Sequence, residues 1–337
     1  MAGSALLAWL LVKLTLVYAL RRGLLDQPGR RRSHSLPTPR GGGLGLLLGA
    51  MPGLVWAFVG HTSVVWSMPS LLALALACAA VMLSGWRDDH ASLPILPRML
   101  VHVLAGVLVS WAIFHGFVFS PSVLALALAL VVATAWSINL HNFMDGIDGL
   151  LGLQSVFFFT ALGALALAAG LAALTTAAWC VAAASGAFLY FNHAPARIFM
   201  GDVGSGTLGL LMVILAAMLW QQQPQWLWAI GILCSAFVVD ASLTLVSRML
   251  RRRRWYTAHR EHLYQWLVRS GFSHSRTGCF YMLWNLLLAA PCAWAAAYWP
   301  KAGLPLCVAL YALGALLWLY GRRVCVARMA EGAHRAA

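Results

Sequence analysis

Charged residues are rare in this sequence, and acidic residues are the rarest of them. Asp and Glu together number nine among 337 residues, charged residues of both signs make up 9%, and hydrophobic residues make up 62%. A soluble domain of this composition would lack the polar residues needed to cover its surface. The composition therefore excludes a soluble globular protein and predicts a polytopic helical membrane protein.

Motifs that would indicate other classes of protein are also missing. The seven cysteines occur singly without a CxxC pair, which argues against a cysteine metal centre or a disulfide framework, and we interpret them as core residues. No internal repeat or separable soluble domain is recognisable, so residues 1–337 are expected to form one membrane domain. The first apolar stretch contains Lys13 and has no basic residues before it, which favours a retained helix over a cleaved signal peptide.

Long apolar stretches dominate what is present. A helix that crosses a bilayer needs roughly 20 mostly apolar residues, and about eleven such stretches can be placed. We therefore predict an all-α, polytopic integral membrane protein with about eleven transmembrane helices. The predicted spans are 4–20, 44–60, 68–86, 99–117, 121–138, 150–169, 171–190, 206–220, 226–247, 279–298 and 303–320.

The basic residues predict how these spans are oriented. With eleven spans, the loops that would share one side of the membrane contain all of the 23 Lys and Arg residues except Lys13 and Lys301. Positively charged loops remain on the cytoplasmic side, so the N-terminus is expected outside and the C-terminus in the cytoplasm. The net charge of +14 is then mainly a topology signal that also attracts anionic lipids and substrates, rather than a nucleic-acid-binding surface.

The few acidic residues mark candidate sites on that same side. Six of the nine lie in short polar segments at one end of the apolar stretches, namely 87–90, 142–149, 200–206 and 259–262. Carboxylates in or beside a membrane are costly, so their clustering indicates a site. A transporter would show polar groups near the middle of the membrane and on both sides. Only Lys13 and Asp240 are charged within the spans, which favours an enzyme at the cytoplasmic interface.

The first two acidic segments each have a functional and a structural interpretation. Asp88 and Asp89 are adjacent, so on a helix they point about 100° apart and need not serve one ion; they either cap the helix or divide the roles of ligand and base. Asn142, Asp145 and Asp148 are spaced by three residues, which would place three oxygen ligands on one ridge if the segment is helical. The alternative for this segment is a glycine-rich turn between helices.

The remaining segments are suited to phosphate and metal binding. Asp202 lies in a glycine-rich stretch at a predicted helix start, where backbone N–H groups can bind phosphate, although the Gly-Lys-Ser/Thr element of a Walker A loop is absent. His259 and His262 lack further ligands at zinc-site spacing and are better suited to a diphosphate. Arg40, beside three glycines, either binds phosphate or belongs to a basic loop that serves only to set the membrane topology. Asp240 either pairs with Arg248 or has a function of its own.

In this order, the segments resemble the polyprenyl-phosphate N-acetylhexosamine-1-phosphate transferases of glycosyltransferase family 4. The resemblance extends from about residue 20 to residue 270 and is closer to the branch that initiates O-antigen and related polysaccharides. It is carried by R-x-x-H-x-x-P-x-P-R-G-G-G at 31–43, the Asp pair at 88–89, N-F-M-D-G-x-D-G at 142–149, N-x-x-P-A-x-I-F-M-G-D-x-G-S-G at 192–206 and H-R-x-H-x-Y-Q at 259–265.

The resemblance implies an enzyme of the cytoplasmic (inner) membrane that transfers a sugar 1-phosphate from a UDP-N-acetylhexosamine, or a 6-deoxy derivative, to undecaprenyl phosphate and releases UMP. It implies Mg²⁺, with Mn²⁺ as the alternative, bound mainly by Asp202, while Asp88 and Asp89 act as base or further metal contacts. The substrate-binding residues implied by position are Arg40, Arg98, Asn142, Asp145, Asp148, Asn192, Phe199, His259, Arg260 and His262.

An alternative class of function is a membrane protein that binds or flips polyprenyl phosphate without catalysing a reaction. The sequence determines neither the sugar and its glycan pathway nor whether transfer is direct or proceeds through a phosphorylated Asp. It also leaves open whether the protein is a homodimer.

Overall fold

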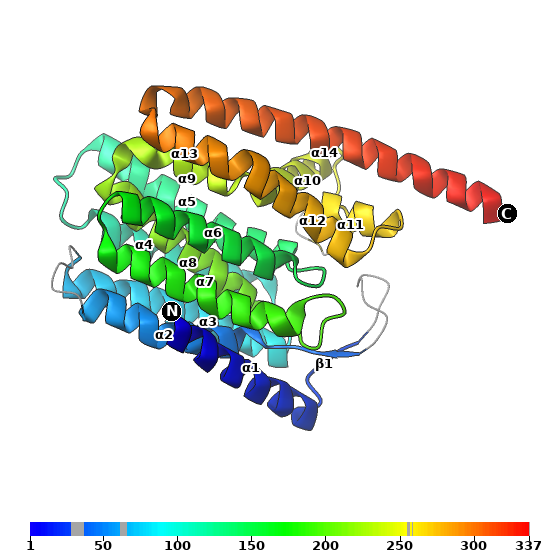
Figure 1. The fold of residues 1–337 in the computed structure, drawn as a ribbon, viewed down its shortest axis with the longest axis horizontal. Coiled ribbons are helices and arrows are strands. Elements are labelled where there is room, and N and C mark those ends of the chain that lie inside the picture. The colour runs from blue at the N-terminus through cyan, green and yellow to red at the C-terminus, as the bar shows by residue number, and fades with distance from the viewer. Residues whose placement is uncertain (28–36, 61–65, 255–256, 258, 337) are drawn as a thin grey trace.

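The computed structural model describes residues 1–27, 37–60, 66–254, 257 and 259–336, and these residues form a bundle of helices (Figure 1). The helices are α1 (Ala2–Arg22), α2 (Gly43–Val59), α3 (Met68–His90), α4 (Ile95–Phe114), α5 (Pro121–Met144), α6 (Leu150–Ala168), α7 (Ala172–Asn192), α8 (Asp202–Gln222), α9 (Leu227–Leu233), α10 (Ser235–Leu250), α11 (Leu263–Arg269), α12 (His274–Trp284), α13 (Ala290–Tyr298) and α14 (Pro300–Ala336). The short strands β1 (Leu25–Asp26) and β2 (Thr38–Pro39) pair antiparallel. The prediction of an all-α polytopic membrane protein is confirmed.

The predicted spans correspond in order to the helices. Within the described residues, nine helical segments are long and apolar enough to cross a membrane. In residues 224–250 a short 3₁₀ turn and α9 are followed by α10 at a bend of 70°, and this bent pair brings the number to ten if it counts as one span. α2 supplies the eleventh stretch and has 17 residues. One of the nine segments, His274–Tyr298, joins α12 to α13 through a π-helical turn at Asn285–Ala289.

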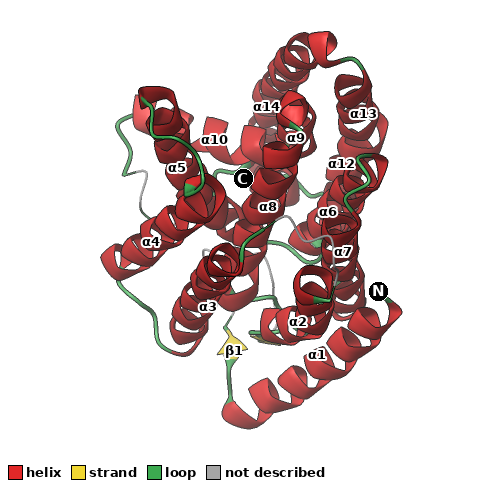
Figure 2. Ribbon diagram, turned by 90° about the vertical axis from the view of Figure 1, so that its left-hand side faces the viewer, coloured by secondary structure: helices red, strands yellow, loops and turns green. Residues whose placement is uncertain are grey.

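Helix α8 lies at the centre of the bundle (Figure 2) and packs against α3 and α5. In its most apolar stretch 83% of the residues are buried, compared with 17% in α5. Small residues in the first turns of α8 permit this enclosure, because a side chain added at Gly204 would collide with the backbone of Gly43 in α2, 2.6 Å away. The beginning of α8 is therefore surrounded by neighbouring elements, and it is there that Asp202 lies.

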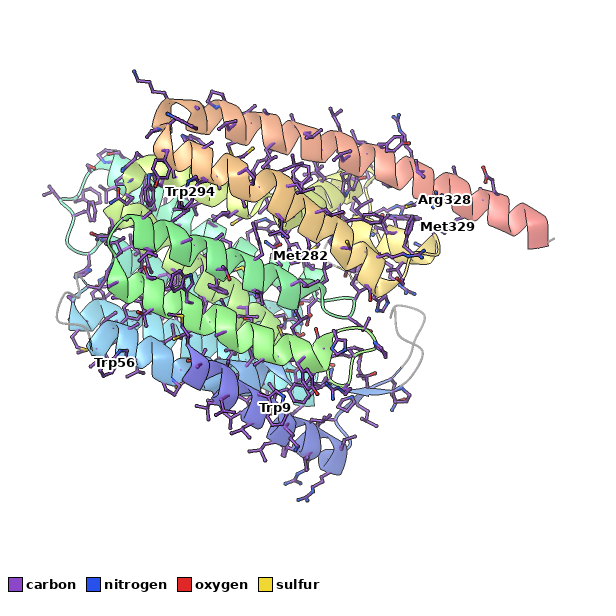
Figure 3. The ribbon with its side chains drawn as sticks, in the orientation of Figure 1. Trp9, Trp56, Met282, Trp294, Arg328 and Met329 are labelled. Atoms are coloured by element: carbon purple, nitrogen blue, oxygen red, sulfur yellow. The ribbon has the colours of Figure 1, made fainter. Side chains whose placement is uncertain are left out.

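The outer surface of the bundle is apolar. Large side chains such as Trp56 and Trp294 project from it (Figure 3), with 64% and 44% of their surface exposed. Such exposure is unfavourable in water and is typical of side chains that face lipid. The surface is consistent with a bundle that crosses the membrane many times.

Helix α14 extends beyond the rest of the bundle. Its 37 residues correspond to about 55 Å, whereas the apolar part of a bilayer is about 30 Å thick. The C-terminal part of α14 carries Arg322, Arg323 and Arg328, and the C-terminus lies at the projecting tip (Figure 1). It projects at the same end of the bundle as the β1–β2 hairpin and α11, so the basic tail lies on the side where the candidate site is found.

Candidate functional site

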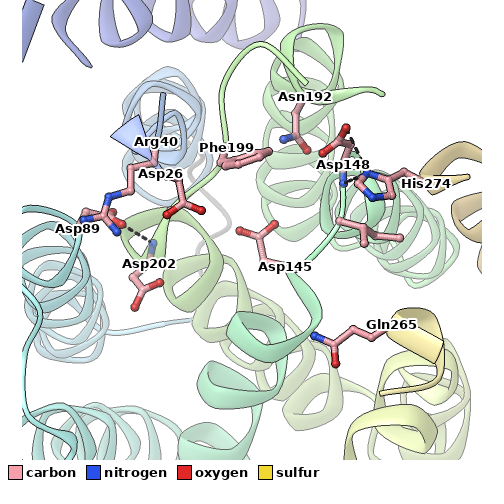
Figure 4. A pocket seen from close by; sticks show the side chains of 13 residues that line it. Asp26, Arg40, Asp89, Asp145, Asp148, Asn192, Phe199, Asp202, Gln265 and His274 are labelled. Carbon is pink, nitrogen blue, oxygen red and sulfur yellow. Dashed lines mark hydrogen bonds and ion pairs between the residues drawn. The ribbon is translucent and has the colours of Figure 1, made fainter. Parts of the chain in front are cut away.

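A polar cavity of about 250 Å³ opens at the end of the bundle where α8 begins (Figure 4). Side chains from the hairpin, from the ends of α3 and α7, from the loops before α6 and α8, and from α11 and α12 converge on it. Its lining residues are Asp26, Arg40, Asp89, Asp145, Gly146, Ile147, Asp148, Asn192, Phe199, Gly201, Asp202, Gln265 and His274. Five of these are aspartates, so the cavity concentrates more than half of the nine acidic residues of the chain.

Asp89 holds the beginning of α8 in place. Its Oδ1 accepts a hydrogen bond from the backbone N–H of Asp202 at 3.0 Å, and its Oδ2 accepts one from Val203 at 3.1 Å. Gly201 precedes them with φ +78°, and a Cβ at this position would lie 2.7 Å from the Asp89 carboxylate. The backbone N–H groups that we predicted as a phosphate site are therefore occupied by Asp89, which is only 4% exposed.

Asp202 is oriented by two further side chains. Its Oδ1 accepts a hydrogen bond from Asn142 Nδ2 at 2.8 Å, and Arg98 Nη1 lies 3.5 Å from its Oδ2. The same Arg98 nitrogen donates to Asp88 Oδ2 at 3.1 Å, while Asp88 Oδ1 accepts from the Leu93 backbone. Asp88, Arg98 and Asn142 line a separate small cavity of about 20 Å³ on the other side of Asp202. Asp88 and Asp89 thus diverge to opposite sides of Asp202.

The segment 142–148 is a turn rather than a ridge. Helix α5 ends at Met144, Asp145 is its C-cap with ψ 40°, and Asp148 lies in the loop before α6. The helical condition for stacking Asn142, Asp145 and Asp148 is therefore not met, although Asn142 bonds to Asp202 and the other two residues line the same cavity as Asp202. The Asp145 carboxylate points into the cavity (Figure 4). Burial, followed by the negative charges of Asp202, Asp89 and Asp148, raises the pKa of Asp145 well above its usual value.

Asp148 and Asn192 connect the loops that enclose the cavity. Asp148 Oδ2 accepts a hydrogen bond from the Ala196 backbone at 3.1 Å and lies 3.2 Å from Nδ1 of His274, the first residue of α12. Asn192, at the end of α7, accepts from the Gly149 N–H and donates to the Ile198 carbonyl, both at 3.0 Å. The amide of Asn192 thus holds the loops before α6 and α8 together.

Arg40 reaches the cavity from the hairpin. The Phe199 N–H donates to the Pro39 carbonyl at 2.8 Å, and the Gly42 N–H donates to the Phe199 carbonyl at 2.9 Å, so the chain after β2 runs beside the loop before α8. The guanidinium of Arg40 lies beside Asp89 (Figure 4), and its buried Nε has no acceptor among the described residues. Such a donor is suited to an anionic ligand. Residues 31–36 of the first motif, including His34, lie outside the described residues.

The segment of His259, Arg260 and His262 does not line the cavity. It lies immediately before α11, whose Gln265 does line it. His262 precedes α11, and its ring lies 4.9 Å from that of His259 and 6.1 Å from that of Phe143. Burial, followed by the charges of His262 and Arg248, lowers the pKa of His259 to about 4, so this imidazole is neutral at neutral pH. Gln265, three residues after His262, is the side chain of α11 that lines the cavity.

The pairing of Asp240 with Arg248 that the sequence suggested is wrong. Arg248 instead forms an ion pair with Glu261, to which Arg253 also donates at 2.9 Å. Asp240 is bonded to backbone and side-chain donors of α10, α11, α12 and α14. The helix on which it lies bends away from α9, which the sequence pattern did not reveal.

The structure brings seven of the thirteen predicted site residues into one cavity: Arg40, Asp89, Asp145, Asp148, Asn192, Phe199 and Asp202. Three more lie around Asp202 on its other side, and three lie on the segment that leads to Gln265. Sequence reasoning missed Asp26, Gly146, Ile147, Gly201, Gln265 and His274 as lining residues. Asp26 could have been found, because it is one of only nine acidic residues. His274 carries no sequence signal of its own.

The cavity is suited to a divalent cation that a ligand helps to bind. No group of three or more His, Cys, Asp or Glu residues is arranged as a metal cage in the described part of the chain. Asp145 and Asp202 are nevertheless hard oxygen donors in one cavity, and the pKa of Asp145 is raised by burial and, after it, by the negative charges of the neighbouring aspartates. Mg²⁺ commonly binds through one or two carboxylates together with substrate phosphates. These residues therefore fit Mg²⁺ bound together with a phosphorylated ligand.

Comparison with known proteins supports the resemblance seen in the sequence. The model of the family described as glycosyl transferase family 4 matches residues 71–220. An undecaprenyl-phosphate alpha-N-acetylglucosaminyl 1-phosphate transferase of Salmonella typhi is 29% identical over 278 residues, covering 76% of this chain and 72% of that protein. A decaprenyl-phosphate N-acetylglucosaminephosphotransferase of Mycobacterium tuberculosis is 29% identical over 319 residues, covering 80% and 75%. Over residues 71–220 the chain is thus similar to glycosyl transferase family 4.

Proposed function

We propose that this protein transfers an N-acetylhexosamine 1-phosphate, or that of a 6-deoxy derivative, from a UDP-sugar to undecaprenyl phosphate and releases UMP. The product would be the first lipid-linked intermediate of a cell-surface glycan such as an O-antigen. The relatives support the transfer of a sugar 1-phosphate to a polyprenyl phosphate, since that is what their names describe. The sugar and the glycan belong to the proposal.

The observation that carries this proposal is the acidic cavity at one end of the membrane bundle. It combines five aspartates with Arg40, and Arg98 lies on the other side of Asp202. Phosphoryl transfer requires positioning and charge neutralisation more than covalent work by the protein. A cavity at the membrane surface can receive a water-soluble nucleotide sugar from one side and the headgroup of a lipid from the bilayer.

Mg²⁺, with Mn²⁺ as the alternative, is the cofactor we propose, held by Asp202 with Asp145 as a second carboxylate. When bound, the ion neutralises charge on the diphosphate of the donor and so favours departure of UMP. Asn142 and Arg98 keep the Asp202 carboxylate fixed. Arg40 donates to a phosphate oxygen through its buried Nε, and His259, Arg260 and His262 contact the diphosphate from the segment before α11.

We propose that Asp88 and Asp89 position other residues and do not act as bases that move a proton. All four of their carboxylate oxygens accept hydrogen bonds in the structure, so both carboxylates are engaged in holding Arg98, the Leu93 backbone and the beginning of α8. A phosphate monoester already carries about 1.5 to 2 negative charges at neutral pH and can attack without a base. In a direct in-line transfer, Asp88 then orients Arg98, and Asp89 holds α8.

The orientation in the membrane follows from the basic residues. The cavity, the Arg-rich segment before α11 and the projecting end of α14 lie at the same end of the bundle. We propose that this end faces the cytoplasm of the cell, that the N-terminus lies outside, and that the membrane is the cytoplasmic (inner) one.

The experiment that tests the proposal measures UMP release from a panel of UDP-N-acetylhexosamines, including 6-deoxy sugars, by membranes that contain the protein, undecaprenyl phosphate and Mg²⁺. UMP from one donor that requires the lipid would support the transferase and identify the sugar. Binding of undecaprenyl phosphate without UMP from any donor would favour a non-catalytic lipid-phosphate protein. A radiolabelled protein that accumulates when the lipid is omitted would contradict direct transfer and indicate a phosphorylated Asp.

A further inference from the structure

Asp240 is the most heavily hydrogen-bonded acidic side chain outside the cavity. It is 2% exposed, and its two oxygens accept five hydrogen bonds. Oδ1 accepts from Leu263 N at 2.7 Å, Trp318 Nε1 at 3.1 Å and Thr244 Oγ1 at 3.2 Å. Oδ2 accepts from Tyr281 Oη at 2.6 Å and Tyr264 N at 3.3 Å. These donors come from α10, α11, α12 and α14.

Two of these bonds fix the position of α11. The N–H groups of Leu263 and Tyr264 belong to the first turn of α11, which has no intrahelical acceptors for them. α11 has only seven residues, and a helix of this length is not stable by its own hydrogen bonds. Asp240 therefore anchors α11 to the three long helices around it.

The other side of α11 contacts the acidic cavity. Tyr264 Oη donates a hydrogen bond to the Phe143 carbonyl at 2.8 Å, at the end of α5 and two residues before Asp145. The fit is close, because a Cβ at Gly146 would lie 2.0 Å from Tyr264 Oη. Gln265 lines the cavity and accepts a hydrogen bond from the His262 N–H at 3.2 Å. A shift of α11 would therefore move both Gln265 and the loop that carries Asp145.

Asp240 does not itself line the acidic cavity. It lies instead at the wall of a separate, mostly apolar cavity of about 170 Å³ between α10, α11, α12 and α14. A direct role in binding the donor or a metal in the acidic cavity is thereby excluded for this structure. Asp240 therefore acts on the cavity through the segment that it contacts, namely α11 and the preceding His262, whose Nδ1 lies 3.9 Å from Asp240 Oδ1.

We infer that Asp240 is a positioning residue that holds the segment 259–265 against the acidic cavity and thereby controls use of the sugar nucleotide. The part of this inference that concerns the sugar nucleotide rests on the proposed function. The part that concerns the position of α11 does not.

The test compares four variants of the full-length protein in detergent or membranes. Asp240→Asn removes one acceptor oxygen and turns an amide towards N–H and O–H donors. Tyr281→Phe and Tyr264→Phe are milder, since each removes a single hydroxyl from the chain of contacts. Tyr311→Phe is the matched control, because it removes a buried hydroxyl that donates to the Gly231 carbonyl at 2.8 Å and has no link to α11.

We expect Asp240→Asn to lower kcat/KM for the UDP-sugar about 100-fold, the loss that a displacement of about 1 Å produces at a reacting centre. The KM for the UDP-sugar should rise at least tenfold while the KM for undecaprenyl phosphate stays within twofold. Tyr264→Phe and Tyr281→Phe should show the same pattern at smaller size, and Tyr311→Phe should match the wild type. Equal KM values for both substrates in all variants, with kcat falling only in proportion to the folded fraction, would overturn the inference.

Cleavage by trypsin after Arg260 provides a readout that does not depend on activity. Release of α11 from Asp240 should increase the rate of this cleavage about tenfold in Asp240→Asn and measurably in Tyr281→Phe, but not in Tyr311→Phe. Equal cleavage rates in the wild type and Asp240→Asn would overturn the positioning role. If the wild type released no UMP with any donor, the proposed function would fail, and the cleavage rates would still decide whether Asp240 positions α11.

Discussion

Asp89 and Asp202 meet at the beginning of α8, yet the structure predicts opposite consequences for their neutralisation. Asp89 uses both oxygens to accept the N–H groups of Asp202 and Val203, and it is 4% exposed. In Asp89→Asn one of these donors faces an amide NH₂ and loses its acceptor. A hydrogen bond to a charged group contributes about 1.5–3 kcal/mol, so the free energy of unfolding should fall by about that amount.

Asp202→Asn should not share this loss of stability. The Asn142 hydrogen bond can be kept by the amide oxygen, and removal of one negative charge relieves repulsion with Asp145 and Asp89. Asp202→Asn should therefore be at least as stable as the wild type but should lose turnover by several orders of magnitude. Asp89→Asn should be less stable and lose about 100-fold in turnover, because α8 and Asp202 shift by about 1 Å.

The assay combines thermal unfolding in detergent, followed by tryptophan fluorescence, with UMP release per folded molecule. Glu331→Gln is the matched control, since it neutralises an acidic residue in the projecting part of α14. A stable Asp89→Asn variant whose turnover is as low as that of Asp202→Asn would contradict the role of Asp89 in holding α8. It would mean that Asp89 acts on the substrates directly rather than through α8.

Three further predictions follow from the cavity. Because the folded-state pKa of Asp145 is raised, its ionisation destabilises the fold as pH rises above about 4. Asp145→Asn should therefore be more stable than the wild type at pH 7.5 and less active. In thermal unfolding, Mg²⁺ should stabilise this variant less than it stabilises the wild type. His274→Gln and Asp148→Asn should each raise the KM for the UDP-sugar. The double variant should show less than the sum of the two effects, because the side chains are 3.2 Å apart. Additive effects in steady-state kinetics would contradict their coupling. Chelation of divalent cations should abolish UMP release, with recovery on Mg²⁺ addition, whereas unchanged release in excess chelator would remove the metal from the mechanism.

Hydropathy and charge predicted the framework of the molecule well. The apolar stretches identified the spans in order, because the length of a membrane helix is set by the bilayer and requires no knowledge of its neighbours. The bend between α9 and α10 was not predicted, since residues 226–247 are apolar enough to form one continuous span and the direction of the bend depends on packing against α13 and α14.

The candidate site was predictable in composition but not in arrangement. The scarcity of acidic residues identified Asp145, Asp148 and Asp202, and the same criterion could have included Asp26. Spacing suggested a helical ridge for Asn142, Asp145 and Asp148, but α5 ends at Met144. The five donors of Asp240 are up to 78 residues away in the chain, so the identity of its partners could come only from tertiary structure.

Isolation of the lipid product is the decisive measurement of the proposed transfer. Purified protein would be incubated with undecaprenyl phosphate, Mg²⁺ and the UDP-sugar that gives UMP, and the lipid fraction would be analysed by mass spectrometry. We predict a lipid diphosphate that carries the sugar, formed in equal amount to UMP by the wild type and by Glu331→Gln, and absent with Asp202→Asn. UMP without a sugar-bearing lipid, or the same lipid product from Asp202→Asn, would contradict this prediction.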